Sequence, residues 1–264
     1  MMNLARISVT PIKGTRLAHP DEVALTLAGI PGNRRFFLVD RRGALFSGGD
    51  HGPLVRVGAR YDPAAGLLEL AFPGKDAITG PVARSTGPIV VDFYGRPVPG
   101  RLVDGPFADA FSALAGQPLR LVMADQEGDG SDVHHLSLVA LASVRDLGAR
   151  NDRPDLDPSR FRMDLEVEGC APFQEESWQG QELEIGDAVI RVEGRIPRCV
   201  VTTQDPRTGL KDFDTLKRIA AFRPFIEDPR GVGFGMYAEV VRPGRVRVGD
   251  AVALRLPTAE GAGA

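Results

Sequence analysis

Along most of the chain, apolar residues alternate with polar ones in a period of two, and Gly, Pro and Asp interrupt the alternation at short intervals. Alternation of this kind is typical of short antiparallel strands that bury one face. In the first hundred residues it predicts strands at 4–12, 22–28, 35–40, 54–61, 67–72 and 88–94. We therefore expect a mainly β protein with few helices.

Two segments of this half combine strands and turns in the order of a β-hairpin. Residues 55–72 read VRVGARY, DPAAG and LLELAF, with a turn expected at Asp62–Gly66. Residues 89–103 read IVVDF, YGRP and VPGRLV and form a second, less regular candidate. The pattern changes at 104–117, where apolar residues recur at helical spacing and Gly116 follows as a C-cap. A helix and a domain boundary near residue 105 are therefore expected.

The second half of the chain mixes the two periodicities. A strand is expected at 119–123 and a helix across 138–149, and residues 161–168, FRMDLEVE, alternate apolar and charged positions. These patterns predict a mainly β, α+β arrangement. It consists of a β domain over residues 1–104, a β domain with helical inserts over 105–257, and a disordered tail over 258–264.

Composition excludes several classes of protein. The chain has 264 residues and two cysteines, Cys170 and Cys199, so a disulfide scaffold is not expected. The N-terminus has no apolar signal segment, and no stretch approaches the ~18–20 apolar residues of a membrane span. A net charge of −3 with interspersed signs gives no strong field for nucleic acid. We expect a cytoplasmic protein without nucleic-acid or membrane partners.

Common catalytic motifs are missing from the sequence. It contains no G-x-S-x-G elbow, no G-x-x-x-x-G-K-[ST] loop and no H-E-x-x-H. The glycines at 231–236, GVGFGM, have the wrong spacing for a dinucleotide fingerprint. His134 and His135 are adjacent and would point to opposite faces of a strand, so we do not expect them to share a metal.

Candidate chemistry concentrates in residues 195–209, RIPRCVVTTQDPRTG, which contain Cys199. A thiolate is a soft ligand for metals such as Cu(I), Zn or a sulfur-bound molybdenum centre, and Arg198 beside it would stabilise the thiolate. The β-branched residues at 200–203 favour extended backbone, and residues 205–209 favour a turn. From the residues alone, a metal-binding Cys199 and a buried structural one are equal alternatives.

Four blocks of the sequence resemble the MOSC superfamily. PRCVVTTQDPRTG resembles its signature stretch. The start, ARISVTPIKG followed by GIPGNRRFFLVDRRG, resembles the β-barrel that precedes the MOSC domain in the mitochondrial amidoxime-reducing component and its bacterial relatives. SRFRMDLEVEGCAPFQEESW and FGMYAEVVRPGRVRVGDAV resemble two further blocks of these proteins. The resemblance implies an N-terminal β-barrel-like domain followed by a β-barrel MOSC domain with helical inserts.

The resemblance also implies a molybdenum cofactor in its molybdopterin form, bound between the two β domains with Cys199 as protein ligand to the metal. The pterin phosphate requires cations and hydroxyl donors around it. By position in the matching blocks, the candidates are Lys13, Arg34, Arg35, Arg160, Arg162, Arg198, Thr202 and Thr203. Asp205 is a candidate for proton delivery, and capping of the following turn is the competing interpretation.

The implied reaction is the reductive removal of oxygen from small N-hydroxylated or N-oxide-type compounds. Electrons would come from a separate donor protein of the ferredoxin, flavodoxin or cytochrome type, because the chain carries no further cysteines for an iron–sulfur domain. One alternative is a sulfur or cofactor carrier that uses Cys199, although the pyridoxal-phosphate domain of cofactor sulfurases is absent. The other alternative is a non-catalytic module that binds anions through its arginines.

Two departures from the family pattern concern the expected cofactor site. Asp164 stands where relatives often have an asparagine, and its carboxylate would repel the phosphate if it faced it. Residues 46–54, FSGGDHGPL, lack the arginine that relatives usually carry before the corresponding Pro-Leu. One residue that contacts the cofactor or the substrate in relatives therefore has no counterpart in this segment.

Overall fold

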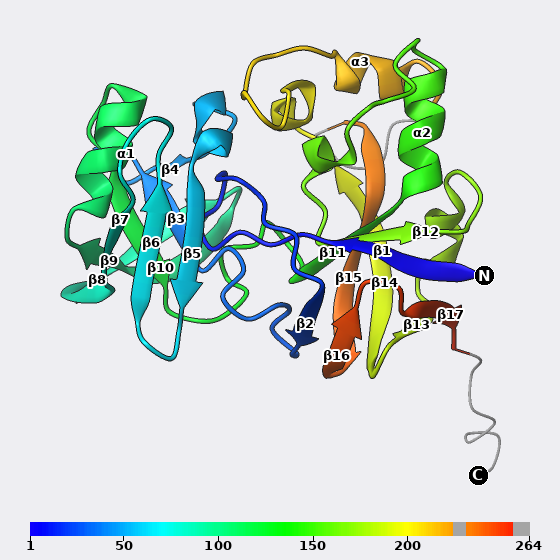
Figure 1. Ribbon diagram of the computed structural model, residues 1–264, viewed down its shortest axis with the longest axis horizontal. Helices are drawn as coiled ribbons and strands as arrows, with labels where there is room; N and C mark the ends of the chain where they lie inside the picture. The colour runs from blue at the N-terminus through cyan, green and yellow to red at the C-terminus, as the bar shows by residue number, and fades with distance from the viewer. Residues whose placement is uncertain (224–230, 256–264) are drawn as a thin grey trace.

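Strands dominate the structure and gather in two lobes (Figure 1). The computed structural model describes residues 1–223 and 231–255, so the tail expected at 258–264 lies outside the described residues. The described strands form a closed barrel, a five-stranded sheet, a three-stranded sheet and a two-stranded pair. The expected mainly β fold with few helices is thus confirmed.

The barrel forms the lobe that carries both ends of the described chain (Figure 1). Its strand order is β1 (Met2–Ile7), β12 (Leu165–Glu168), β11 (Leu136–Ala140), β15 (Gly233–Arg242), β14 (Ala188–Pro197), β13 (Glu182–Ile185) and β17 (Ala251–Leu254). Neighbours are antiparallel except β11 and β12, which are parallel. The interior is apolar and includes Leu4, Leu138, Trp178 and Ile190. The first strand of the chain therefore completes a barrel built otherwise from the second half.

The other lobe consists of two sheets and a helix. Its five-stranded sheet has the order β4 (Leu45–Phe46), β3 (Phe36–Val39), β10 (Arg120–Ala124), β9 (Arg96–Asp104) and β8 (Ala83–Phe93). The three-stranded sheet has the order β5 (Gly58–Asp62), β6 (Leu67–Ala71) and β7 (Ile78–Pro81). The helix α1 (Phe107–Ala115) buries Phe107 and Phe111 in an apolar core shared with Phe36, Leu68 and Leu121.

Short elements link the lobes and cover the barrel. β2 (Glu22–Leu25) pairs with β16 (Gly244–Arg247), which ties an N-terminal segment to a C-terminal one. The helices α2 (Leu141–Ala149) and α3 (Thr215–Ala220) lie together at one end of the barrel lobe (Figure 1). The described residues also form the 3-10 turns η1 (Gly52–Arg56), η2 (Pro158–Phe161), η3 (Gln174–Trp178) and η4 (Val200–Thr203).

Several expected elements are confirmed and others are shifted. The helix expected after residue 104 is α1, and Gly116 ends it in the left-handed conformation with φ 67°. The helix expected at 138–149 is wrong in its first turn, because residues 136–140 form the buried strand β11. A continuous apolar run does not distinguish strand from helix by its periodicity. The strand expected at 54–61 starts only at Gly58, because Pro53 opens the turn η1.

The domain limits expected from the sequence, 1–104 and 105–257, remain a prediction. Each lobe draws on the chain on both sides of residue 105, since β1 lies in the barrel whereas α1 and β10 lie in the other lobe. In the part of the chain that the structure describes, no helix has the length and apolarity that crossing a bilayer requires.

Glu175 makes the stability of the barrel lobe depend on pH. Its side chain is 0% exposed in η3, where Oε2 accepts a hydrogen bond from the Ser143 hydroxyl at 2.9 Å. Burial raises the pKa of this carboxyl from 4.5 to about 7. Because the folded state binds the proton more tightly than the unfolded state, this contribution to stability is complete below the unfolded pKa. It is lost as the pH rises through the folded pKa.

We expect ionisation of Glu175 to lower the free energy of unfolding by up to about 3 kcal/mol between about pH 5 and about pH 8. Glu175→Gln should remove this dependence, because the amide does not ionise. Urea unfolding at the two pH values measures the change, with Glu184→Gln on the exposed face of β13 as control. Equal pH dependence in the wild type and Glu175→Gln would contradict the assignment.

Candidate functional site

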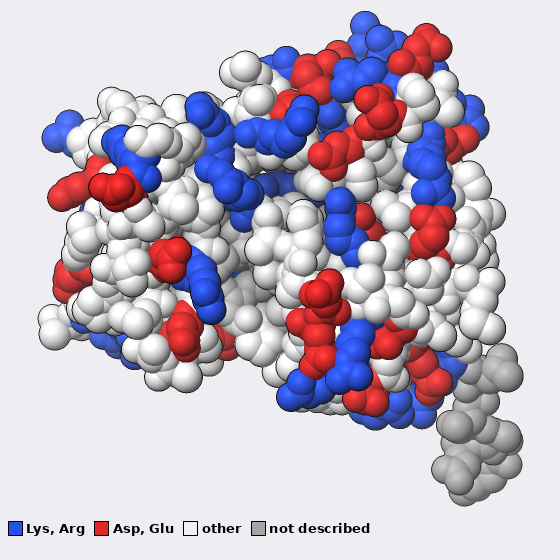
Figure 2. Space-filling view, viewed as in Figure 1, with Lys and Arg blue, Asp and Glu red and all other residues white. Residues whose placement is uncertain are grey.

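A cavity of about 640 Å³ opens between the two lobes. One wall contains Lys13, Arg34, residues 44–45 and 47–50, Tyr94 and residues 131–132. The barrel side contributes His134, Ser137 and residues from 160–164 and 196–202. Lys and Arg side chains gather around the upper part of the groove between the lobes (Figure 2). A cleft of this size with converging polar groups is the usual form of a small-molecule site.

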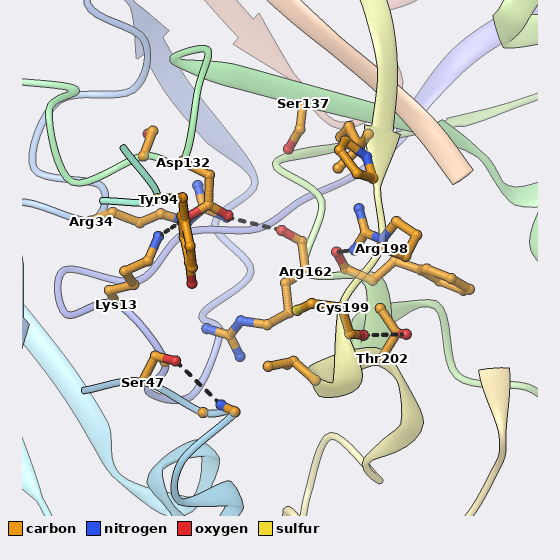
Figure 3. A pocket seen from close by; sticks show the side chains of 18 of the residues that line it. Lys13, Arg34, Ser47, Tyr94, Asp132, Ser137, Arg162, Arg198, Cys199 and Thr202 are labelled. Carbon is orange, nitrogen blue, oxygen red and sulfur yellow. Dashed lines mark hydrogen bonds and ion pairs between the residues drawn. The ribbon is translucent and has the colours of Figure 1, made fainter. Parts of the chain in front are cut away.

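Cys199 lies in this cavity with an exposed side chain (Figure 3). The strand β14 ends just before it, and Cys199 caps η4. Its carbonyl accepts hydrogen bonds from the Thr202 N–H at 3.2 Å and from the Thr202 hydroxyl at 2.9 Å. The extended backbone expected at 200–203 is wrong, because these bonds close a 3-10 turn. The alternative of a buried structural Cys199 is also wrong, since its thiol is open to the cavity.

Two half-buried guanidinium groups of the cavity have no carboxylate partner within the described residues. Arg198 donates a hydrogen bond to the backbone carbonyl of Phe161. Its guanidinium also lies over the aromatic ring of Phe161, with Cζ 5.5 Å from the ring centre. Arg162, whose φ is 55°, donates to the Thr15 carbonyl at 2.7 Å. Burial lowers the pKa of both groups, and together with the charge of Arg34 it brings Arg162 to about 10. A cation that is partly removed from water and lacks a counter-ion is unfavourable, so this wall favours an anionic ligand.

Lys13 and Arg34 bring their own carboxylate partners. Lys13 Nζ lies 2.6 Å from Asp132 Oδ1, and burial lowers the pKa of this amine although Asp132 opposes the shift. Arg34 Nη1 lies 2.6 Å from Asp164 Oδ1, and Ser137 donates its hydroxyl to the same carboxylate at 2.6 Å. Asp164 is therefore neutralised by Arg34, and the repulsion of a phosphate that its sequence position predicts is offset.

Arg160 supports η4 from behind the thiol. Its side chain is 1% exposed, donates to the Thr202 carbonyl at 3.0 Å and pairs with Asp212 at 3.2 Å. Arg160 therefore stabilises the turn that carries Cys199. Its charge is balanced by Asp212. Seven of the ten expected site residues thus line the cavity: Lys13, Arg34, Arg160, Arg162, Arg198, Cys199 and Thr202.

The other three expected residues are not brought to the cavity. Arg35 extends toward Glu127, with Nε 3.6 Å from Oε1, and Thr203 donates its hydroxyl to the Val200 carbonyl at 2.7 Å. Asp205 Oδ1 accepts the N–H groups of residues 207 and 208 at 3.0 and 2.8 Å. Partial burial raises the pKa of Asp205, but these hydrogen bonds outweigh it and hold the pKa below its usual value. Asp205 caps the turn, and the geometry does not support proton delivery by it.

Several residues that reach the cavity were not among the expected site residues, and all but Ser137 come from loops and turns. They are Ser47, Gly48, Asp50, Tyr94, Asp132, His134 and Ser137. The loop at 47–50 lies within the segment 46–54 that lacks the expected arginine, and Gln204 Nε2 donates to the Gly48 carbonyl at 2.9 Å. Hydrophobic periodicity predicts where helices and strands lie in the sequence. Which loop residues face a cavity depends on tertiary packing, which the periodicity does not contain. For residues 47–50, the sequence Ser-Gly-Gly-Asp indicates a loop but not that the loop faces the cavity.

The donor set of the cavity fits a metal that is carried by an anionic group. Among residues 1–223 and 231–255, no three His, Cys, Asp or Glu side chains come together as metal ligands. A metal at Cys199 would therefore take its remaining ligands from the group that carries it. The exposed thiol suits a soft metal, and the unpaired guanidinium groups of Arg162 and Arg198 suit a phosphate.

Curated relatives cover different shares of the chain. Mitochondrial amidoxime reducing component 2 of Rattus norvegicus is 30% identical over 70% of this chain and 62% of its own length. The protein of the same name from Bos taurus is 25% identical over 94% of this chain and 82% of its own length. Molybdenum cofactor sulfurase of Drosophila grimshawi is 40% identical over 31% of this chain and 10% of its own length. The chain thus spans less than two thirds of the rat relative.

Two family models also match the chain in the order that the sequence blocks predict. The MOSC N-terminal beta barrel domain matches residues 1–101, and the MOSC domain matches residues 125–253. The relatives and these two matches confirm the resemblance drawn from the sequence, and one relative's name refers to the molybdenum cofactor. The chain belongs to the MOSC superfamily, with a MOSC N-terminal β-barrel domain ahead of a MOSC domain.

Proposed function

We propose that the chain is a molybdenum-cofactor-dependent reductase of small N-hydroxylated compounds. The observation that carries this proposal is the exposed Cys199 thiol, which shares one cavity with the unpaired guanidinium groups of Arg162 and Arg198. The names of the rat and cattle relatives, amidoxime reducing components, support the substrate class.

Five cavity residues have a part in this proposal. Cys199 would be the protein ligand to molybdenum, and Arg162 and Arg198 would hold the pterin phosphate. Arg198 directly precedes Cys199 in the chain and lines the same cavity. Its contact with the Phe161 ring fixes the guanidinium in place. Thr202 shapes the turn through its two bonds to the Cys199 carbonyl.

When bound, the molybdenum centre supplies two-electron chemistry that removes oxygen from an N–O bond. The overall reaction converts R–NH–OH, two electrons and two protons into R–NH₂ and water. The chain binds and orients the N–O group in the cavity between the lobes. A separate donor protein of the ferredoxin, flavodoxin or cytochrome type supplies the electrons. Protons enter from solvent, because Asp205 lies outside the cavity.

Metal and cofactor analysis combined with a reductase assay tests the proposal. The protein is produced in a host that makes the molybdenum cofactor and assayed for bound molybdenum, for pterin, and for reduction of benzamidoxime by dithionite-reduced viologen. We expect near-stoichiometric molybdenum and formation of benzamidine. Anion binding without molybdenum in such a host would instead indicate the non-catalytic module.

A carrier of the cofactor or of sulfur is the second candidate. The exposed Cys199 thiol and the partial match to a cofactor sulfurase favour it. A carrier would contain molybdenum or a persulfide but would not reduce benzamidoxime. It would pass its load to a cofactor-free molybdenum enzyme, which activation of that enzyme measures.

A further inference from the structure

Tyr94 occupies a backbone conformation that its residue type disfavours. Phe93 pairs with Arg96, so the β8–β9 hairpin turns through Tyr94 and Gly95 alone. Both have positive φ, 56° for Tyr94 and 94° for Gly95. Such two-residue turns favour Asn, Asp or Gly at the first central position, and a tyrosine there is strained. Strained residues persist where function requires them, so the side chain of Tyr94 needs an explanation.

The side chain of Tyr94 lies in the cavity that contains Cys199. Its residue is 61% exposed, although large aromatic side chains are usually buried. Figure 3 shows the ring beside Lys13 and Asp132, on the side of the cavity opposite Arg198. The ring therefore presents apolar surface in the opening between the lobes.

The hairpin that carries Tyr94 is anchored on both sides of its tip. Arg96 donates to the carbonyls of Asp129 and Ser131 at 2.7 and 2.5 Å. The Phe93 ring lies beneath the cations of Lys13 and Arg96, at 5.3 and 5.6 Å from its centre. Asp92 accepts the Gly95 N–H at 3.0 Å. The turn is therefore fixed, and its side chain is presented at a defined place.

The hydroxyl of Tyr94 remains protonated at working pH. Desolvation and the nearby acidic groups of Asp132, Cys199 and Asp50 raise its pKa to about 12. The group can donate a hydrogen bond but does not act as a base. A hydrogen bond with Ser47 opposes the shift and already engages the hydroxyl, so the face of the ring is the contact that Tyr94 offers to a ligand.

We propose that Tyr94 is the specificity-determining residue of the cavity and selects aromatic N-hydroxylated substrates, such as aryl amidoximes, by stacking on their ring. This inference rests on the proposed reductase function and adds the substrate class to it. Aromatic pairs stack with offset or edge contacts and contribute beyond the area that they bury. A rigid, exposed ring at the opening of the cavity provides that contact for an aryl group while the N–O group points inward.

Substrate comparison tests the proposal on the cofactor-loaded protein. For Tyr94→Ala, KM for benzamidoxime should rise about tenfold, whereas KM for acetamidoxime should change less than about twofold. Tyr94→Phe keeps the stacking ring and should retain the preference for the aromatic substrate. Val90→Ala, an exposed change on the same hairpin, is the control. Equal changes of KM for both amidoximes in Tyr94→Ala would overturn the inference.

A fluorescence titration gives a readout independent of turnover. Tyr94→Trp places an indole in the cavity, whereas the single native tryptophan, Trp178, is 0% exposed in the barrel core. Benzamidoxime should quench the added indole at concentrations where acetamidoxime does not. If the wild type binds no molybdenum and reduces nothing, the reductase proposal fails, and this titration still decides the role of Tyr94. Absence of quenching by benzamidoxime would overturn that role.

Stability supplies the third arm of the test. Asparagine tolerates positive φ at this turn position, so Tyr94→Asn should raise the unfolding temperature while it removes the preference for benzamidoxime. A higher unfolding temperature together with a lost preference for benzamidoxime distinguishes a tyrosine kept for function from one kept for the fold. A Tyr94→Asn variant that is less stable than the wild type would show that the ring supports the fold, and would overturn the proposal.

Discussion

Cys199→Ser is expected to lose bound molybdenum and amidoxime reduction together, each by at least about 100-fold. Loss of a group that only hydrogen-bonds to a metal ligand costs about 10–100-fold in affinity or activity, so loss of the ligand should cost no less. A serine hydroxyl remains protonated near neutral pH and is a poor ligand for a soft metal. Metal analysis and viologen-linked reduction of benzamidoxime on the same preparation measure the two losses.

The fold should survive this substitution, because the Cys199 side chain is exposed and surface changes move stability by about 0.5 kcal/mol or less. Cys170→Ser is the matched control. The Cys170 thiol packs against the barrel core, and burial raises its pKa to about 11, so it is chemically inert. Cys170→Ser should keep its molybdenum, and molybdenum retention in Cys199→Ser would remove Cys199 from the proposed mechanism.

Elements defined by local pattern could be predicted from the sequence. The hairpin turn expected at Asp62–Gly66 lies between β5 and β6, where Asp62 pairs with Leu67. The stretch around Cys199 was identified because its residue types carry chemistry of their own. Its conformation was not, because the 3-10 turn η4 is held by Arg160, which is distant in sequence. The conformational preferences of residues 200–203 alone do not predict a contact with a residue so far away in the sequence.

The remaining part of the site depends on tertiary pairing. The segment 161–168 alternates like a strand, yet Arg162 has φ 55° and only Leu165–Glu168 forms β12. Arg34 stabilises this bend, since it donates to the Arg162 carbonyl at 2.9 Å and pairs with Asp164. Sequence alone made Asp164 a source of repulsion, because the partner that neutralises it lies 130 residues away in the chain.

Arg34→Ala is expected to lower the free energy of unfolding by about 3–5 kcal/mol, the usual cost of leaving a buried charge without its partner. The Asp164 side chain is 2% exposed, and without Arg34 it would keep only the neutral donors Asn33 and Ser137, at 2.9 and 2.6 Å. Urea unfolding at neutral pH measures the change. The argument assigns the loss to the unpaired carboxylate and not to the missing side-chain volume of Arg34.

The double variant Arg34→Ala/Asp164→Asn separates charge from packing, because asparagine removes the buried charge and keeps an acceptor for Ser137. It should recover all but about 1 kcal/mol of the loss, the net value of an ordinary hydrogen bond. Asp164→Asn alone leaves Arg34 as a further unpaired cation of the cavity, so it should bind phosphate more tightly than the wild type, which calorimetry measures. If the double variant is as unstable as Arg34→Ala, packing of the arginine side chain stabilises the bend, and the neutralisation of Asp164 is not its basis.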